Sequence, residues 1–186
     1  MSLTLFLSRS SRLGLLILLG LCSLIAIAQA EATTREPLNP SAHLVRNILG
    51  YVRWPHAPYP IRLCVVPPSA STKALLELSD NSDESPLRTL LQPPEASALK
   101  AHCDFIYIGN ISSDDRHILL NGLIGQPVLT LTESPQGCSE GSLFCIRQAA
   151  ARASFTVNLD AIARSGLYVH PQVLQLGSRE VAEPTQ

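Results

Sequence analysis

The sequence contains few charged residues, few aromatic residues and none of the common catalytic motifs. Charged residues make up 16% and aromatic residues 5% of the 186 residues, and the formal net charge is −1. This charge argues against a general nucleic-acid binder, which needs a strongly basic surface. The sequence has no G-x-S-x-G, P-loop, G-x-G-x-x-G or H-E-x-x-H pattern. We therefore expect a protein that is not an enzyme and uses no cofactor.

Patterns for metal binding and thiol redox chemistry are absent as well. No C-x-x-C spacing occurs, and the five histidines are scattered along the chain. Structural zinc sites use closely spaced Cys and His ligands, and thiol redox centres commonly use C-x-x-C. We expect neither a metal site nor such a redox centre.

Residues 1–30 have the pattern of an export signal. Two arginines precede an apolar run from Leu13 to Ala28, and Ala28 and Ala30 are the small residues that a cleavage site needs. A membrane anchor is the alternative, although the run is short for a span of about 20 residues. The pattern predicts a cleaved signal peptide and an exported mature chain.

The rest of the chain reads as a single α/β domain. Residues 31–40 predict a flexible leader and residues 178–186 a polar tail. Between them, residues 41–177 alternate helical and strand patterns, which favours a largely parallel central sheet flanked by helices. Two late strands without a long connection predict an antiparallel pair at the end of the sheet.

Apolar periodicity and capping residues place the individual elements. Ser41 is the expected N-cap of the first helix, and Gly166 the expected C-cap of a late one. We expect helices at residues 41–52, 71–78, 94–100, 112–123, 159–165 and 172–176. We expect strands at residues 61–66, 87–91, 104–109, 127–131, 143–147 and 154–159, the last two joined by residues 148–153.

The mature chain retains four of the five cysteines: Cys64, Cys103, Cys138 and Cys145. An even number in an exported chain indicates two disulfides, with three possible connectivities. We favour Cys138–Cys145, because residues 139–142 form a turn-rich segment that can fold back. We favour Cys64–Cys103 with it, because these residues lie in or beside apolar runs that can be neighbours in one sheet.

Two groups of residues are candidates for binding. Phe144 precedes Cys145 beside a small disulfide-closed turn, where an apolar ring can anchor another protein. A core position in a strand is the alternative for Phe144. Arg53, Trp54 and His170 lie beside prolines in loops and together predict a pocket for an anion or an aromatic group. Packing or helix capping is the alternative for each of these three.

Four segments carry a resemblance to a known family. They are residues 155–166 (FTVNLDAIARSG), 169–176 (VHPQVLQL), 141–145 (GSLFC) and 51–55 (YVRWP). With Arg62-Leu63-Cys64 and Cys103-Asp104, they extend over about residues 43–177. This pattern closely resembles the YfiR family of periplasmic regulators.

The resemblance implies a periplasmic repressor that binds the periplasmic part of an inner-membrane diguanylate cyclase (YfiN-like). Repression would lower cyclic di-GMP and thereby control biofilm and exopolysaccharide formation. An outer-membrane lipoprotein of the OmpA type (YfiB-like) would sequester the repressor, and reduction of the second disulfide would also relieve repression. The resemblance further implies a homodimer and the two disulfides favoured above. The alternative function is a periplasmic small-molecule sensor without a cyclase partner.

The resemblance also implies roles for particular residues. Partner contacts are expected at four positions: Ser139, Phe144, Ile162 and Arg164. A small-molecule pocket is expected around Arg53 and His170, next to Trp54. Tyr168 stands where the family has a basic residue, so this chain departs from the family pattern beside the pocket.

Overall fold

The computed structural model describes residues 39–79, 85–149 and 152–178. The predicted signal peptide, nearly all of the predicted leader and residues 179–186 of the predicted tail lie outside these ranges. The helices are α2 (Pro40–Leu49), α3 (Thr72–Leu76), α4 (Ala96–His102), α5 (Ser113–Gly122), the 3-10 helix η1 (Pro135–Cys138), α6 (Leu159–Ser165) and α7 (Gln172–Ser178). The strands are β1 (Val52–Arg53), β2 (Ile61–Val66), β3 (Leu87–Leu91), β4 (Phe105–Ile108), β5 (Leu129–Thr132), β6 (Phe144–Ala149), β7 (Arg152–Val157) and β8 (Tyr168–Val169).

A six-stranded sheet in the order β3-β2-β4-β5-β6-β7 is the centre of the fold. The first five of these strands are parallel, and β7 is antiparallel to β6. The α/β class, the largely parallel sheet and the late antiparallel pair are thereby confirmed. The strands of that pair continue to Ala149 and begin at Arg152, within the segment expected to join them.

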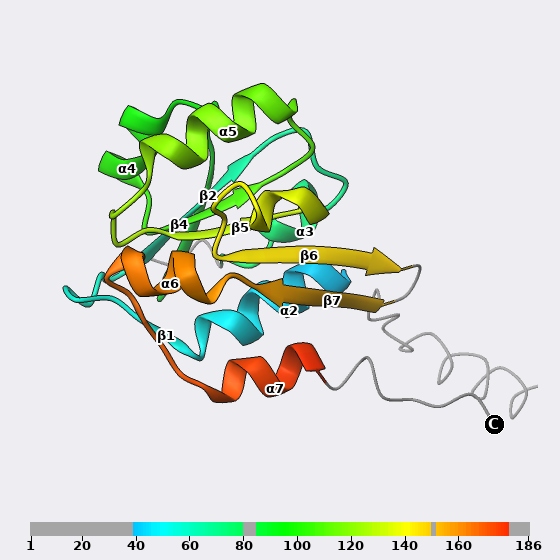
Figure 1. The fold of residues 1–186 in the computed structure, drawn as a ribbon. Helices are drawn as coiled ribbons and strands as arrows, with labels where there is room; N and C mark the ends of the chain where they lie inside the picture. Colours follow the sequence, from blue (N-terminus) through cyan, green and yellow to red (C-terminus); the bar gives the residue numbers. More distant parts are fainter. Residues whose placement is uncertain (1–38, 80–84, 150–151, 179–186) are drawn as a thin grey trace, which may run out of the picture. The chain divides into compact units, whose positions relative to one another are not determined.

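Helices cover both faces of this sheet (Figure 1). The core on one face combines α2, α3, α6 and α7 with alternate strand residues such as Phe105 and Tyr107. The core on the other face combines α4 and α5 with the intervening residues, including Ile106 and Ile108. All four residues of β4 are therefore fully buried, as expected for a central parallel strand.

The two disulfides have the connectivity that the sequence favoured. Cys64–Cys103 joins β2 to the residue that ends α4, and Cys138–Cys145 joins η1 to β6. Among the described residues, no helix has the length and apolar character that crossing a bilayer requires.

The helix ends follow local capping chemistry, with one correction to the prediction. The side chain of Asn39, rather than that of Ser41, caps α2 by accepting hydrogen bonds from the backbone N–H groups of Ser41 and Ala42. Asn158 caps α6 in the same way, and Gly166 ends that helix with a left-handed φ of 73°. These two caps determine where α6 begins and ends beside the disulfide-closed turn.

A separate two-stranded ribbon was not predicted. Val52 of β1 pairs with Val169 of β8, and the strands are antiparallel. Strands of two residues contain too few positions to show a hydrophobic period, so pattern analysis cannot detect them. The ribbon places the segment after α2 beside the segment after α6.

Candidate functional site: a groove beside a disulfide-closed turn

The disulfide Cys138–Cys145 closes a turn that side chains from other elements also hold. The side-chain amide of Asn158 donates to the carbonyl oxygen of Cys138 over 2.6 Å. The hydroxyl of Thr130 in β5 accepts the backbone N–H of Leu143 over 3.0 Å. The turn is therefore attached to the start of α6 and to β5 as well as closed by its own disulfide.

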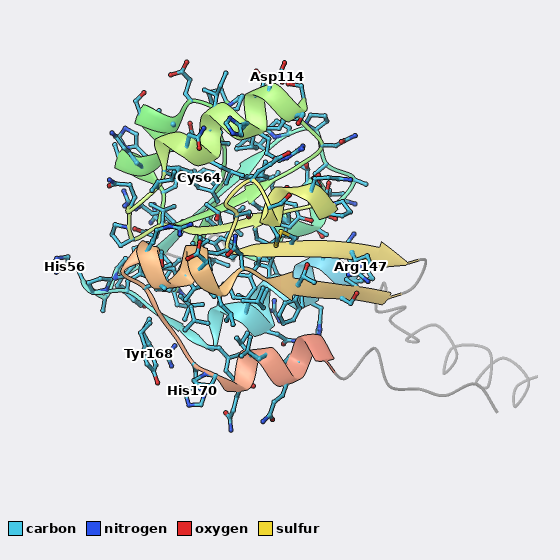
Figure 2. The ribbon with its side chains drawn as sticks, viewed as in Figure 1. His56, Cys64, Asp114, Arg147, Tyr168 and His170 are labelled. Atoms are coloured by element: carbon cyan, nitrogen blue, oxygen red, sulfur yellow. A yellow bond between two sulfur atoms is a disulfide. The ribbon has the colours of Figure 1, made fainter. Side chains whose placement is uncertain are left out.

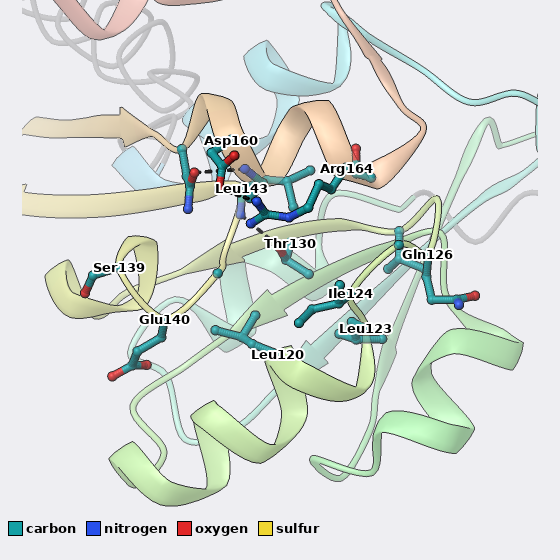
Figure 3. Close-up of a pocket in the computed structure, with 16 residues that line it drawn as sticks. Leu120, Leu123, Ile124, Gln126, Thr130, Ser139, Glu140, Leu143, Asp160 and Arg164 are labelled. Atoms are coloured by element: carbon teal, nitrogen blue, oxygen red, sulfur yellow. Dashed lines mark hydrogen bonds and ion pairs between the residues drawn. The ribbon is translucent and has the colours of Figure 1, made fainter.

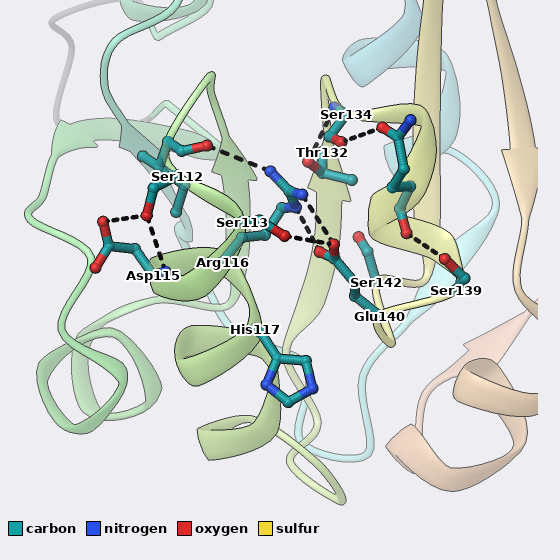
Figure 4. Close-up of polar contacts among 12 residues, drawn as sticks. Ser112, Ser113, Asp115, Arg116, His117, Thr132, Ser134, Ser139, Glu140 and Ser142 are labelled. Atoms are coloured by element: carbon teal, nitrogen blue, oxygen red, sulfur yellow. Dashed lines mark hydrogen bonds and ion pairs between the residues drawn. The ribbon is translucent and has the colours of Figure 1, made fainter.

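An ion pair between Arg116 and Glu140 connects the turn to α5 (Figure 4). The guanidinium donates from Nε to Oε2 over 2.5 Å and from Nη2 to Oε1 over 2.9 Å. Arg116 is only 6% exposed, so water contributes little to its solvation. The hydrogen bonds from Arg116 lower the pKa of Glu140 from its ordinary value of 4.5, although partial burial acts in the opposite direction.

A groove of about 190 Å³ lies between α5, the disulfide-closed turn and α6. One wall carries Asp160 and Arg164, which form an ion pair on α6. Figure 3 shows the apolar side chains of Leu120 and Ile124 facing them from the end of α5 and the turn that follows it. Ile124 is 61% exposed, so its apolar side chain is accessible to a molecule in the groove.

The lining of the groove is suited to binding another molecule. Polar and charged groups, including Ser139 and Glu140 of the turn, alternate with apolar side chains. The arrangement can hold a partner segment that presents both apolar and charged side chains.

The four predicted partner residues occupy different environments. Ser139 and Arg164 are exposed and line the groove, on opposite sides of it. Ile162 is half-buried on α6 and packs against the main core. Phe144 is fully buried, with its ring centroid 5.7 Å from that of Phe155. The interpretation of Phe144 as an exposed anchor is therefore corrected: this ring packs in the core beneath the turn.

The β1–β8 ribbon determines the positions of the residues predicted to form a small-molecule pocket. Arg53 pairs in register with Tyr168, and His170 follows directly after β8, so these residues occupy one ribbon. Figure 2 shows Tyr168 and His170 side by side in that segment, and their ring centroids are 6.4 Å apart. The guanidinium of Arg53 donates to the carbonyl oxygen of Val52 over 2.8 Å.

Trp54 contacts the sheet rather than the ribbon. Its indole N–H donates to the carbonyl oxygen of Asp104 over 3.1 Å, and its ring packs against the main core. The structure thus places Arg53 and His170 on or directly beside one ribbon and places the polar end of Trp54 at the start of β4. A ligand pocket formed by the three remains a prediction.

Sequence reasoning missed Arg116 and Glu140, which hold the turn. An arginine on an amphipathic helix and a glutamate in a turn are both expected at the surface, and 24 positions separate the two. The one available signal was a single acidic residue within a segment otherwise rich in Gly and Ser.

In the described part of the chain, no three His, Cys, Asp or Glu side chains gather at a possible metal site.

Comparison with protein families places most of the described chain in a known family. The sequence profile of the family described as YfiR/HmsC-like matches residues 40–178. The match includes the whole sheet, the groove and both disulfides.

We predict that Glu140→Gln destabilises the protein by about 1–3 kcal/mol at neutral pH, because the buried guanidinium of Arg116 loses its anionic partner. The folded-state pKa of Glu140 is lowered, so its charge stabilises the protein above pH 4.5 and this contribution is lost as the pH falls through the lowered value. Urea unfolding of both proteins at pH 7 and pH 3 measures the difference, which should shrink at pH 3.

Glu77→Gln is the matched control, because Glu77 is a carboxylate in an ion pair with Lys73 that is largely exposed. We expect this change to have little effect on the free energy of unfolding. A loss for Glu140→Gln that is the same at both pH values would contradict the assigned role of its charge.

Proposed function

The chain belongs to the YfiR/HmsC-like family, and from this premise we propose that it represses an inner-membrane diguanylate cyclase by binding the cyclase's periplasmic part. The protein is a periplasmic regulator of cyclic di-GMP signalling, and regulators of this family are not catalytic. Its two disulfides fit the oxidising periplasm. The groove beside the disulfide-closed turn is the observation that supports a protein partner.

A repressor of this kind acts by changing the conformational populations of its partner. Shifting a two-state equilibrium from 1:99 to 99:1 requires about 5.5 kcal/mol of difference in affinity between the two states. The groove offers apolar contacts at Ile124 and an ion-pairing group at Arg164, two kinds of contact that can distinguish one partner conformation from another. The proposed cyclase-binding surface consists of this groove, which includes Ser139 on the turn, and of Ile162 on α6.

Two inputs would relieve repression in this proposal. An outer-membrane lipoprotein of the OmpA type would sequester the repressor and lower its free concentration. Reduction of Cys138–Cys145 would release the covalent closure of the turn that carries Ser139 and Glu140. We also propose a homodimer, as the family resemblance suggests, and sedimentation equilibrium that shows monomer alone would exclude it.

A small-molecule sensor is the second candidate function. The observation that favours it is the β1–β8 ribbon, which carries Arg53 and is followed directly by His170, both of them exposed. In this alternative the protein binds a small ligand tightly at the ribbon and has no cyclase partner.

Deletion of the gene is predicted to raise intracellular cyclic di-GMP, because the cyclase loses its repressor. The rise should disappear when the cyclase gene is deleted as well. Quantification of the nucleotide in the parent, the single mutant and the double mutant tests this. An unchanged level in a strain that expresses the cyclase would contradict repression and favour the sensor.

Arg164→Glu is predicted to weaken binding to the periplasmic part of the cyclase at least tenfold. The change reverses the charge on one wall of the groove and removes the ion pair with Asp160. Arg46→Glu is the matched control, because Arg46 is also an exposed arginine in the last turn of a helix but lies outside the groove. Calorimetric titration measures both affinities, and equal losses would exclude a specific role for the groove.

The double change Cys138→Ser and Cys145→Ser is predicted to leave export intact and to impair repression. Without the disulfide, the short turn loses about 2.5 kcal/mol of chain-entropy stabilisation and samples other conformations. Cyclic di-GMP is measured in the deletion strain complemented with either form, and the amount of each form in the periplasmic fraction is the control. Full repression by the variant would rule out redox relief.

A further inference from the structure

A second cavity, of about 550 Å³, lies at the carboxyl ends of the parallel strands. Its lining residues lie in the segments that follow β2, β4 and β5 or belong to β6. They are Pro68, Ser69, Ala70, Asn110, Glu133, Pro135, Ile146 and Arg147. No residue of the groove or of the β1–β8 ribbon is among them. Its volume lies within the range of about 300–1,000 Å³ that is typical of small-molecule sites.

The topology of the sheet makes this edge a crevice. The chain leaves β2 toward α3, whose Leu75 is buried in the core on one face. It leaves the adjacent strand β4 toward α5, whose Leu119 is buried in the core on the opposite face. The connections after two neighbouring parallel strands therefore diverge, and open α/β sheets bind ligands at such a point.

The floor of this crevice is closely packed. The backbone N–H of Asn110 donates to the carbonyl oxygen of Pro68 over 2.7 Å, and that of Gly109 donates to Val66 over 2.9 Å. A Cβ atom at Gly109 would lie 2.3 Å from the carbonyl oxygen of Pro68, so the two loops approach as closely as only glycine allows. These contacts fix the loop after β2 against the loop after β4.

The cavity has an acidic group whose carboxylate is held in position. The Oε1 atom of Glu133 accepts hydrogen bonds from the hydroxyl of Ser69 over 2.7 Å and from the hydroxyl of Tyr107 over 2.8 Å. Burial raises the pKa of Tyr107, and the Glu133 carboxylate raises it further, so the phenol remains a donor. Among residues 39–79, 85–149 and 152–178, no Lys or Arg forms an ion pair with Glu133.

Arg147 supplies a positive charge to the same cavity from β6. Its side chain is exposed and labelled on that strand in Figure 2. Within the described ranges it forms no ion pair either. The cavity thus contains a carboxylate and a guanidinium that form no ion pair with each other or with another described residue.

We propose that this cavity binds a small zwitterion of the amino-acid type. Glu133 accepts the ammonium group, and Arg147 pairs with the carboxylate, for which a guanidinium offers two parallel donors. Pro68, Ala70 and Ile146 form apolar wall, which favours a ligand with an aliphatic side chain. This inference does not depend on the cyclase partner, and it concerns a different site from the β1–β8 ribbon.

The test uses L-leucine, its methyl ester and N-acetyl-L-leucine with the purified mature protein. The ester lacks the carboxylate charge and the acetyl derivative lacks the ammonium charge. We expect leucine to bind saturably at millimolar concentrations or below and to shift the amide resonances of Ala70, Asn110 and Arg147. We expect each derivative to bind at least tenfold more weakly.

Two variants connect binding to the cavity. Glu133→Gln keeps an acceptor for Ser69 and Tyr107 but removes the charge, and Arg147→Gln removes the opposite charge. We expect each to weaken leucine binding at least tenfold without changing the melting temperature appreciably. Glu95→Gln, at an exposed position outside the cavity, is the control and should bind as the wild type does.

The proposal is overturned by any of three results. These are no saturable binding of leucine, binding that both charge variants leave unchanged, or resonance shifts confined to the β1–β8 ribbon. None of them bears on the measurement of cyclic di-GMP, so failure of this site and failure of the proposed function can be distinguished.

Discussion

The ion pair between Arg116 and Glu140 is the interaction on which the shape of the groove depends. It joins α5, which supplies one wall, to the turn that supplies another. Because Arg116 is almost completely buried, its charge requires a partner, and the only acidic residue that it pairs with in the described structure lies within the turn. The disulfide closes the turn, and this pair, together with the hydrogen bonds to Asn158 and Thr130, sets where the closed turn lies.

The energies involved separate the two proposed ways of relieving repression. A disulfide across so short a loop contributes about 2.5 kcal/mol, which is less than the roughly 5.5 kcal/mol needed to reverse a two-state population fully. In the proposed mechanism, reduction alone would therefore weaken repression without abolishing it. Sequestration by a second partner acts on the free concentration of the repressor by mass action, so it has no comparable ceiling. Redox state would adjust the response, whereas the lipoprotein would switch it.

Most of the fold was predictable because each element carries a local signal. Apolar runs such as Phe105–Ile108 reveal buried strands, and Gly166 marks the end of a helix. The β1–β8 ribbon and the Arg116–Glu140 pair were not predictable, because both arise between segments far apart in the sequence. The position of Phe144 was not predictable either, because the sequence alone did not decide whether its side chain lies in the core or at the surface. The groove and the second cavity each combine single residues from several elements, and none of these residues is distinctive by itself.

Strand β5 connects the two sites that the structure suggests. Thr130 within it accepts the N–H of Leu143 at the base of the turn, and Glu133 follows its last residue at the opposite end of the strand. A buried parallel strand is rigid, and coupling between sites requires an element with two alternative arrangements. The disulfide-closed turn is the element here with an identifiable trigger, because its disulfide can be reduced. A ligand at Glu133 can therefore influence the groove only to the extent that it changes how β5 holds this turn.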